Sequence, residues 1–284
     1  MPTKSKANVV ALFGKARKKI PELALDVPLK PIAEDPQQIP SAGYAIPASK
    51  PKLILAIGSG QTGKSTLLRW IAERATERGS EMALATLAPN RTLRHYFPDT
   101  MHPDGNSTSA GATFLEEIFN AAAEDKINAV IDFPGDDTAL PHLLDQGLDP
   151  AGMLEEAGVE LVTLFTLSPR VEDLTTMAQL AARGFAPKAT ALIRNQGLTR
   201  DPTLPPEPEF DAVIEHSAYR AAVERGAAEI WMPRCYSAAV IENQRLLFGQ
   251  ARDGTDLLPS DRSRTHHWMR SMETAFSPIA SWLP

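Results

Sequence analysis

The stretch from Leu53 to Thr66 carries the clearest chemistry in this chain of 284 residues. Five apolar residues end at Ile57, Gly58 follows, and Gly63-Lys64-Ser65 comes after a gap of four residues. This is the spacing of a phosphate-binding P-loop. Glycines let backbone N–H groups approach a phosphate, the lysine reaches its oxygens, and the next hydroxyl ligates Mg²⁺. The sequence therefore predicts a site for the phosphates of a nucleotide.

The predicted contacts with nucleotide and metal come from one continuous segment. Lys64 is expected to reach the β- and γ-phosphates and to act in catalysis, and Ser65 is expected to bind Mg²⁺. The full set of predicted cofactor-binding residues in this segment is Gly58, Ser59, Gly60, Gln61, Thr62, Gly63, Lys64, Ser65 and Thr66.

The residues on either side of the loop predict the elements that position it. The apolar run before Gly58 is too short for a buried helix and is typical of a buried parallel strand. After Ser65, the residues Leu67, Leu68 and Ile71 recur at helical spacing. The positive end of this predicted helix would face the anion. A strand before the loop and a helix after it distinguish a P-loop from a chance glycine turn.

Asp132 is the second chemical signal. It ends the apolar run from Ile127, as the aspartate of a Walker B strand does, and the carboxyl ends of parallel strands are where ligands bind in open α/β sheets. Asp132 is therefore predicted to share the Mg²⁺ with Ser65 and to take part in catalysis. The turn over residues 133–137 is predicted to sense the γ-phosphate. The alternative is an ordinary aspartate at the end of a strand.

Strand and helix patterns alternate along the rest of the chain. Further strands are predicted at 81–87, 159–167, 189–195 and 229–232, and helices at 114–125, 138–146, 151–157, 168–183, 212–225, 237–252 and 262–276. This alternation predicts an α/β fold of the P-loop NTPase type: a doubly wound, mostly parallel sheet with a helical C-terminal extension. The predicted divisions are a basic tail and Pro-rich linker (1–51), the ATPase domain (52–254) and the extension (255–284).

Composition restricts the setting and the partners. The net charge of −6 argues against a protein coated by nucleic acid, but leaves room for a local basic patch. One cysteine excludes an internal disulfide and favours the cytoplasm. Residues 1–20 hold six Lys or Arg and no acid, which predicts contact with DNA, an anionic membrane or a partner protein. A solvated tail is the alternative.

Several segments resemble the ParA/MinD branch of P-loop ATPases. Residues 58–66 are similar to the phosphate loop of that family, and 130–135 to its Walker B strand. Residues 82–90 resemble its second strand. The late segments 192–195 and 232–234 resemble, respectively, the strand whose final Asn meets the base and the loop that packs on adenine.

The resemblance implies ATP and Mg²⁺ as cofactors, with Asn195 and Pro233 at the base. It also implies a nucleotide-dependent switch in plasmid or DNA partition or in conjugative transfer, acting as a possible homodimer with a DNA-bound adaptor or a transfer-machinery protein. Guanine-specific P-loop proteins carry an aspartate where this chain has Leu198, which also favours adenine.

Three positions depart from the family. Ser59 stands in place of an additional lysine, and Thr86 and Ala88 stand in place of two switch carboxylates. These departures predict slow hydrolysis, with Asp136 or Asp137 as the candidate substitute carboxylate. Two other functions therefore stay open. One is a P-loop metabolite kinase or a ligase of the dethiobiotin synthetase type, with Arg91, Arg94 and His95 lining an acceptor pocket. The other is a nucleotide-binding scaffold with little hydrolysis.

Overall fold

The computed structural model describes residues 44–89 and 92–284. Residues 39–284 form one compact unit. The predictions for the basic segment 1–20, for most of the linker and for Arg91 fall outside the described residues.

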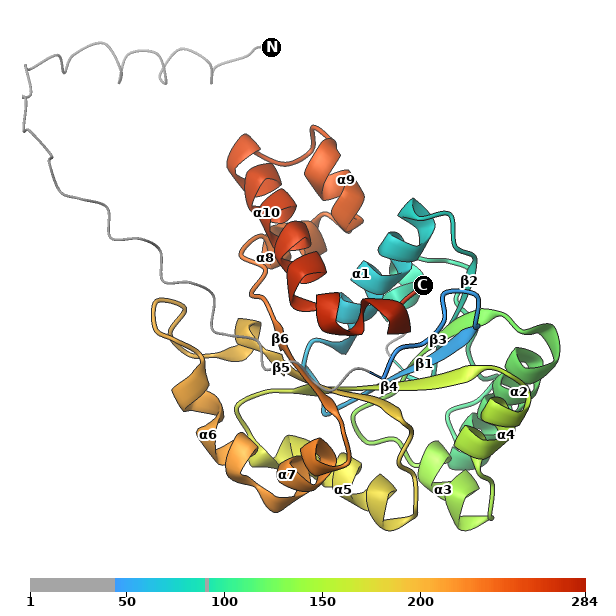
Figure 1. Ribbon diagram of the computed structural model, residues 1–284. Helices are drawn as coiled ribbons and strands as arrows, with labels where there is room; N and C mark the ends of the chain where they lie inside the picture. Colours follow the sequence, from blue (N-terminus) through green and yellow to red (C-terminus); the bar gives the residue numbers. More distant parts are fainter. Residues whose placement is uncertain (1–43, 90–91) are drawn as a thin grey trace, which may run out of the picture. The chain divides into compact units, whose positions relative to one another are not determined.

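A six-stranded sheet organises the described chain, with the strand order β2-β3-β1-β4-β5-β6 and every neighbouring pair parallel (Figure 1). The six strands predicted from the sequence are confirmed within one or two residues at each end. They are β1 (Lys52–Ile57), β2 (Met82–Thr86), β3 (Asn128–Asp132), β4 (Glu160–Leu167), β5 (Ala189–Asn195) and β6 (Ala228–Met232).

Helices cover both faces of the sheet, as a doubly wound fold requires (Figure 1). One face carries α1 (Lys64–Glu77), the short 3₁₀ helix η1 (Thr92–His95), α8 (Ala238–Asn243), α9 (Phe248–Asp253) and α10 (Pro259–Ala275). The other face carries α2 (Thr108–Asp125), α3 (Ala139–Asp145), α4 (Pro150–Glu156), α5 (Thr175–Ala182), α6 (Glu207–Glu215) and α7 (Ser217–Glu224).

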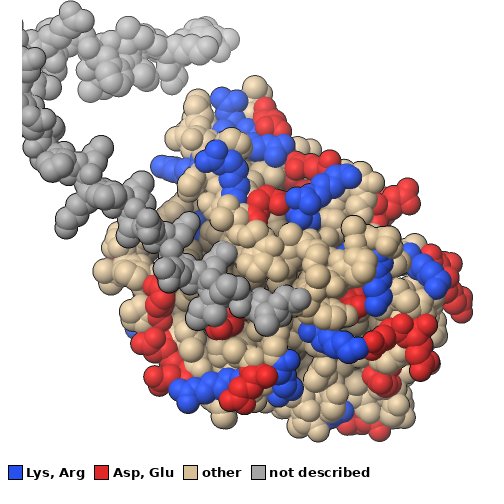
Figure 2. Space-filling view, in the orientation of Figure 1, with Lys and Arg blue, Asp and Glu red and all other residues tan. Residues whose placement is uncertain are grey.

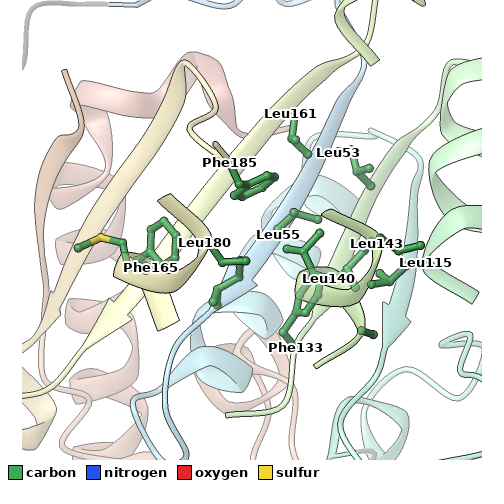
Figure 3. Close-up of a cluster of buried hydrophobic side chains, with 14 of the residues drawn as sticks. Leu53, Leu55, Leu115, Phe133, Leu140, Leu143, Leu161, Phe165, Leu180 and Phe185 are labelled. Carbon is green, nitrogen blue, oxygen red and sulfur yellow. The ribbon is translucent and has the colours of Figure 1, made fainter. Parts of the chain in front are cut away.

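The strand β1 shows why the chain builds two cores. Leu53 and Leu55 point into the cluster under α2–α7, where Figure 3 shows Leu53 near Leu161, whereas Ile54 points into the cluster under α1 and α10. Successive side chains of a strand alternate between faces, so a strand that is apolar throughout supplies both layers.

Three predicted helices differ from the observed ones. The helix predicted at 212–225 is split at His216, which is extended and accepts a hydrogen bond from the backbone N–H of Ala218 to start α7. The helix predicted at 237–252 is also split, because Arg245 adopts a left-handed conformation between α8 and α9. At 168–183, a short 3₁₀ helix, η2 (Val171–Leu174), precedes α5.

Three helices begin earlier than their apolar patterns indicate, one of them α6, which starts at Glu207 and not at 212. Helix α2 starts at Thr108 because Ser107 caps it, with the Ser107 hydroxyl accepting from the Ala110 N–H at 3.1 Å. Helix α10 starts at Pro259, a residue suited to a first helical turn. The Ser107 cap thus extends α2 beyond the apolar periodicity used to predict it, whereas the early starts of α6 and α10 are accompanied by prolines in the first turn.

The last helices pack on the P-loop layer. Helix α10 contacts α9 and β6, and the ring of Phe276 lies 5.0 Å from that of Trp70 on α1. Two further 3₁₀ helices, η3 (Gln196–Leu198) and η4 (Ser277–Trp282), complete the described elements. None of the helices in the described part of the chain is both long and apolar enough to cross a membrane.

Charges of both signs are interspersed on the described surface in Figure 2, and no extended basic area appears on the face shown there.

Candidate functional site

The loop between β1 and α1 has the backbone of a P-loop. Gly63 has a left-handed φ of 97° and precedes Lys64, the first residue of α1. A Cβ on Gly63 would lie 2.3 Å from the Asn195 amide nitrogen, and a Cβ on Gly58 would lie 2.5 Å from the Thr166 carbonyl oxygen. Both positions therefore require glycine, because the loop is packed closely against the ends of β4 and β5.

Thr62 fixes the middle of the loop. Its hydroxyl donates to the Ser59 carbonyl at 2.9 Å and lies 2.7 Å from the Thr166 hydroxyl at the end of β4. Gln61, just before it, has a left-handed φ of 65°. The predicted order of strand, loop and helix is thus confirmed, and the loop joins the end of β1 to the first turn of α1.

Lys64 folds back over this loop. Its ammonium group donates to the carbonyls of Gly58 at 2.6 Å and Ser59 at 2.8 Å. Burial lowers the pKa of Lys64, while the carboxylates of Asp132 and Asp173 act in the opposite direction. A phosphate placed in the loop would meet a partly desolvated cation, for which its attraction is stronger than in water.

Asp132 lies beside the P-loop because β3 pairs directly with β1, with Asp132 opposite Ala56. The side chain is 2% exposed, and burial raises its pKa to about 6, against the effects of Lys64 and of a hydrogen bond with Thr86. Its Oδ1 is buried and has no hydrogen-bond partner among the described residues. A buried carboxylate oxygen of this kind needs a partner.

A Mg²⁺ ion fits these donors. Magnesium in nucleotide sites takes one or two protein oxygens and fills its remaining positions with phosphate oxygens and water. Asp132 and the hydroxyl of Ser65, in the first turn of α1, would be the protein ligands. No group of three or more His, Cys, Asp or Glu side chains suited to a metal occurs among the described residues, so an all-protein metal cage is not the alternative there.

The turn after β3 touches the loop. A Cβ on Gly135 would lie 2.5 Å from the backbone nitrogen of Gly60. Asp137 accepts from the N–H groups of Ala139 (3.2 Å) and Leu140 (3.1 Å) at the start of α3, whereas Asp136 is exposed. Of the two substitute carboxylates, Asp137 is therefore committed to α3 and Asp136 faces solvent.

Asn195 and Pro233 lie on the other side of the loop. The Asn195 amide donates to the Thr62 carbonyl at 3.0 Å, and its oxygen accepts from the Gly197 N–H at 2.8 Å. The Pro233 carbonyl accepts from the indole of Trp268 at 3.0 Å. The structure thus brings both residues to the carboxyl edge of the sheet, and the Asn195 side chain connects β5 to the P-loop. Their contact with a base stays a prediction.

Thr86 has a role at the site that its residue type did not reveal. It stands opposite Asp132 in the β2–β3 pairing. Its hydroxyl hydrogen-bonds to the Asp132 carboxylate and accepts from the Ala88 N–H at 3.1 Å. The absence of an acid at this position had suggested only a loss of function, whereas the hydroxyl orients the predicted metal ligand.

A second group missed from the sequence follows β4. Asp173 is 2% exposed and accepts from the backbone N–H (2.8 Å) and the hydroxyl (2.5 Å) of Ser168. Arg170 donates to the same hydroxyl at 3.1 Å and to Asp173 at 3.4 Å. No spacing rule marks these three residues. Only the position of β4 beside β1 brings them to the P-loop edge.

A separate hollow of about 720 Å³ lies between η1 and α2. Arg94 lines it and contacts His102, with 2.9 Å between their nitrogens. His95 is exposed and is not part of the lining. Of the three residues proposed for an acceptor pocket, only Arg94 is therefore placed in a hollow, since Arg91 is not among the described residues.

Comparisons with known proteins find no match among protein-family models or curated proteins. Among solved structures, the chain is similar to the signal recognition particle receptor FtsY from Elizabethkingia anophelis in complex with GDP, with 15% identity, a TM-score of 0.40, and coverage of 68% of this chain and 60% of that one. The signal recognition particle 54 kDa protein from Aeropyrum pernix K1, also in complex with GDP, gives 15% identity, a TM-score of 0.40, and coverage of 66% and 42%.

Chloroplast FtsY from Physcomitrella patens gives 14% identity, a TM-score of 0.39, and coverage of 65% of this chain and 59% of that one. The chain spans less than two thirds of the length of each of these three structures. Function at this site therefore has to be argued from the residues of this chain.

Proposed function

We propose that this protein binds ATP with Mg²⁺ at the P-loop and acts as a slow ATPase that switches partners according to its nucleotide. The observation that carries the proposal is the electrostatic contact between Lys64, at the start of α1, and Asp132, at the end of the neighbouring strand β3. One buried oxygen of Asp132 has no hydrogen-bond partner among the described residues. Lys64 can thus bind phosphate and Asp132 can bind Mg²⁺ at the same loop, where the first turn of α1 also offers backbone N–H groups.

The roles of the residues follow from their placement. The N–H groups of residues 59–65 would surround the phosphates, and Lys64 would exchange its two carbonyl partners for phosphate oxygens. Mg²⁺, held by Ser65 and Asp132, would supply charge neutralisation for the phosphates. Phosphoryl transfer depends mainly on such positioning and electrostatic stabilisation.

Slow turnover is part of the proposal. The hydroxyl of Thr86 is bonded to Asp132 and to the Ala88 N–H, so it cannot act as a base for the attacking water. Asp137 is bonded to the start of α3. Asp136 is the remaining carboxylate of the turn that faces solvent, and it would have to move toward the phosphates to orient water.

The biological setting is proposed from the ParA/MinD resemblance. A nucleotide switch of that kind, acting as a homodimer in the cytoplasm, would serve plasmid or DNA partition or conjugative transfer. A DNA-bound adaptor or a transfer-machinery protein would be its partner. Residues 1–20 would supply the contact with DNA or an anionic membrane, since their six basic residues contrast with the mixed charges on the face in Figure 2.

A second candidate is a P-loop kinase or ligase acting on a small metabolite. The observation in its favour is the hollow of about 720 Å³ at the β2 edge, which is large enough for a small acceptor and includes Arg94. Its lining also includes the acidic residues Asp99, Asp104 and Glu117, which would oppose an anionic acceptor. The third function left open by the sequence, a nucleotide-binding scaffold, differs from the proposed switch only in hydrolysing little or no ATP.

The deciding experiment is calorimetry with ATP, with and without Mg²⁺, followed by phosphate release with and without DNA. The switch proposal expects Mg²⁺-dependent binding, slow release alone and a change in release with DNA or a partner. Failure to bind any nucleoside triphosphate would refute nucleotide binding. Fast release that depends on an added metabolite would favour the kinase or ligase.

A further inference from the structure

The segment that follows β4 presents an exposed arginine beside the P-loop. Strand β4 pairs with β1, with Phe165 opposite Ile57. At the shared carboxyl edge, Thr166 lies against Gly58 and Thr62. The chain then passes through Ser168 to Arg170, so Arg170 stands four residues beyond a direct contact with the phosphate loop.

Two polar residues, Ser168 and Asp173, hold the Arg170 side chain in place. Asp173 is fully buried and fixes Ser168 through its backbone N–H and its hydroxyl. The Arg170 Nε donates to that hydroxyl, and one terminal nitrogen approaches Asp173 at 3.4 Å. The arginine side chain is nevertheless 59% exposed. A buried carboxylate thus orients a guanidinium whose remaining donors face solvent.

The same carboxylate links this arginine to the phosphate-binding lysine. Asp173 is one of two carboxylates that act on the Lys64 ammonium, the other being Asp132. Asp173 therefore interacts with both cations, through its charge with Lys64 and through a direct contact with Arg170. A nucleotide in the loop would add several phosphate charges to these interacting groups.

We propose that Arg170 is a second phosphate-binding cation of the nucleotide site, oriented by Ser168 and Asp173. A planar guanidinium can make two parallel contacts with phosphate oxygens, which a single ammonium cannot. This inference rests on the proposed nucleotide binding and adds a specific residue to it. An ion pair that only stabilises the start of η2 is the competing explanation, and the experiment below separates the two.

The test uses the full chain and measures the affinities of ATP, ADP and adenosine by calorimetry with Mg²⁺. Arg170→Ala is expected to weaken ATP and ADP binding about fivefold to twentyfold and to leave adenosine within twofold. Arg170→Lys is expected to recover part of the loss, because charge returns without the paired donors. Asp173→Asn should give an intermediate loss for ATP and ADP, because the acceptor for Ser168 remains while the charge that orients Arg170 is gone.

Arg183→Ala is the matched control. Arg183 is also a partly exposed arginine paired with one carboxylate, Asp145, but it follows α5 and lies beside Lys188 and Glu160 near the amino ends of β4 and β5. It is expected to bind all three ligands as the parent does. If Asp173→Asn does not fold, Ser168→Ala removes one of the contacts that orient Arg170 and takes its place.

The outcomes separate this inference from the proposed function. If Lys64→Ala loses ATP while Arg170→Ala binds it within twofold of the parent, Arg170 is not a phosphate ligand and nucleotide binding stands. An equal loss for adenosine and ATP would assign Arg170 to the fold and overturn the inference. If the parent chain itself binds no nucleotide, the proposed function fails first.

Discussion

The two sides of the P-loop differ in what their side chains already contact. On the β3 side, Asp132 has a buried oxygen without a partner among the described residues, and the Lys64 ammonium donates to two carbonyls of the loop. On the β5 side, both polar atoms of the Asn195 amide are bonded within the protein. The first side is prepared for a ligand, whereas the second supports the loop that binds it.

This difference shows how the site is divided between chemistry and support. A buried oxygen without a hydrogen-bond partner costs free energy, and a bound metal ion can offset that cost. A satisfied amide instead fixes geometry, and the Asn195 amide nitrogen occupies the space that a Cβ on Gly63 would need, so Asn195 packs directly against the loop. We therefore expect changes on the β3 side to act on phosphate and metal directly, and changes on the β5 side to act through the loop or the base.

Lys64→Ala should have the largest effect on nucleotide affinity. A charge-assisted contact with phosphate contributes on the order of 1.5–3 kcal/mol, or about tenfold to 150-fold in affinity. Calorimetry with Mg-ATP measures the loss, and circular dichroism checks that the fold survives. Lys188→Ala, which removes an exposed lysine paired with Glu155, is the control and should bind as the parent does. Parent-like binding by Lys64→Ala would show that this loop does not hold phosphate.

Discrimination between ATP and GTP tests the β5 side of the comparison. Leu198, in η3 just after Asn195, offers no carboxylate to the N–H donors of guanine. Leaving such donors buried and unpaired costs about 1–3 kcal/mol, or roughly one to two decades in affinity. Competition binding should therefore favour ATP. Equal or tighter GTP binding would sink the adenine assignment and weaken the ParA-like interpretation of the C-terminal half.

The Asn195→Ala variant tests whether Asn195 affects nucleotide binding through the loop alone. Removing the amide leaves the Thr62 carbonyl and the Gly197 N–H without their partner, and it frees the loop. We expect ATP, GTP and inorganic pyrophosphate to weaken together, by about tenfold, because the change reaches the phosphates through Thr62. If only ATP weakens and pyrophosphate does not, Asn195 acts through the base and not through the loop.

The part of the site predicted from the sequence is the part whose geometry is local. A P-loop needs a strand, a loop of fixed length and a helix, so the spacing from Gly58 to Ser65 determines its shape. Asp132 was predictable for a similar reason, since an apolar run ending in an acid is a local pattern. The six strands were predicted for the same reason: buried parallel strands are short and apolar.

The other contacts depend on which strands become neighbours. The pairing of β2 with β3 places the Thr86 hydroxyl on Asp132, and the pairing of β4 with β1 places Ser168 and Asp173 at the loop. Local sequence patterns do not determine either of these strand pairings. Helix ends were missed where a polar cap or one left-handed residue decided them, as at Ser107 and Arg245.

Thr86→Val should have the smallest effect, and its pH dependence makes it informative. Burial raises the pKa of Asp132 to about 6, and the hydrogen bond with Thr86 opposes that rise. Mg²⁺ binds the ionised carboxylate, so Mg-dependent ATP affinity in the parent should fall as the pH drops through about 6. Without the hydroxyl, that midpoint should move upward. The loss should be about fivefold or less near pH 6.5, since one hydrogen bond contributes about 1 kcal/mol, and it should vanish near pH 8.

The pH dependence of the stability of the nucleotide-free protein independently checks that the pKa of Asp132 is raised. The pKa of Asp132 in the folded chain lies above the usual aspartate value of 3.8, so the folded state holds its proton at a higher pH than the unfolded state does. Asp132 therefore lowers the free energy of unfolding as the pH rises from about 4 to about 6, and adds no further slope above that. Asp132→Asn should remove this slope and also the effect of Mg²⁺ on ATP binding. A variant that keeps both would show that Asp132 is neither the buried acid nor the metal ligand, and the contrast between the two sides of the loop would lose its basis.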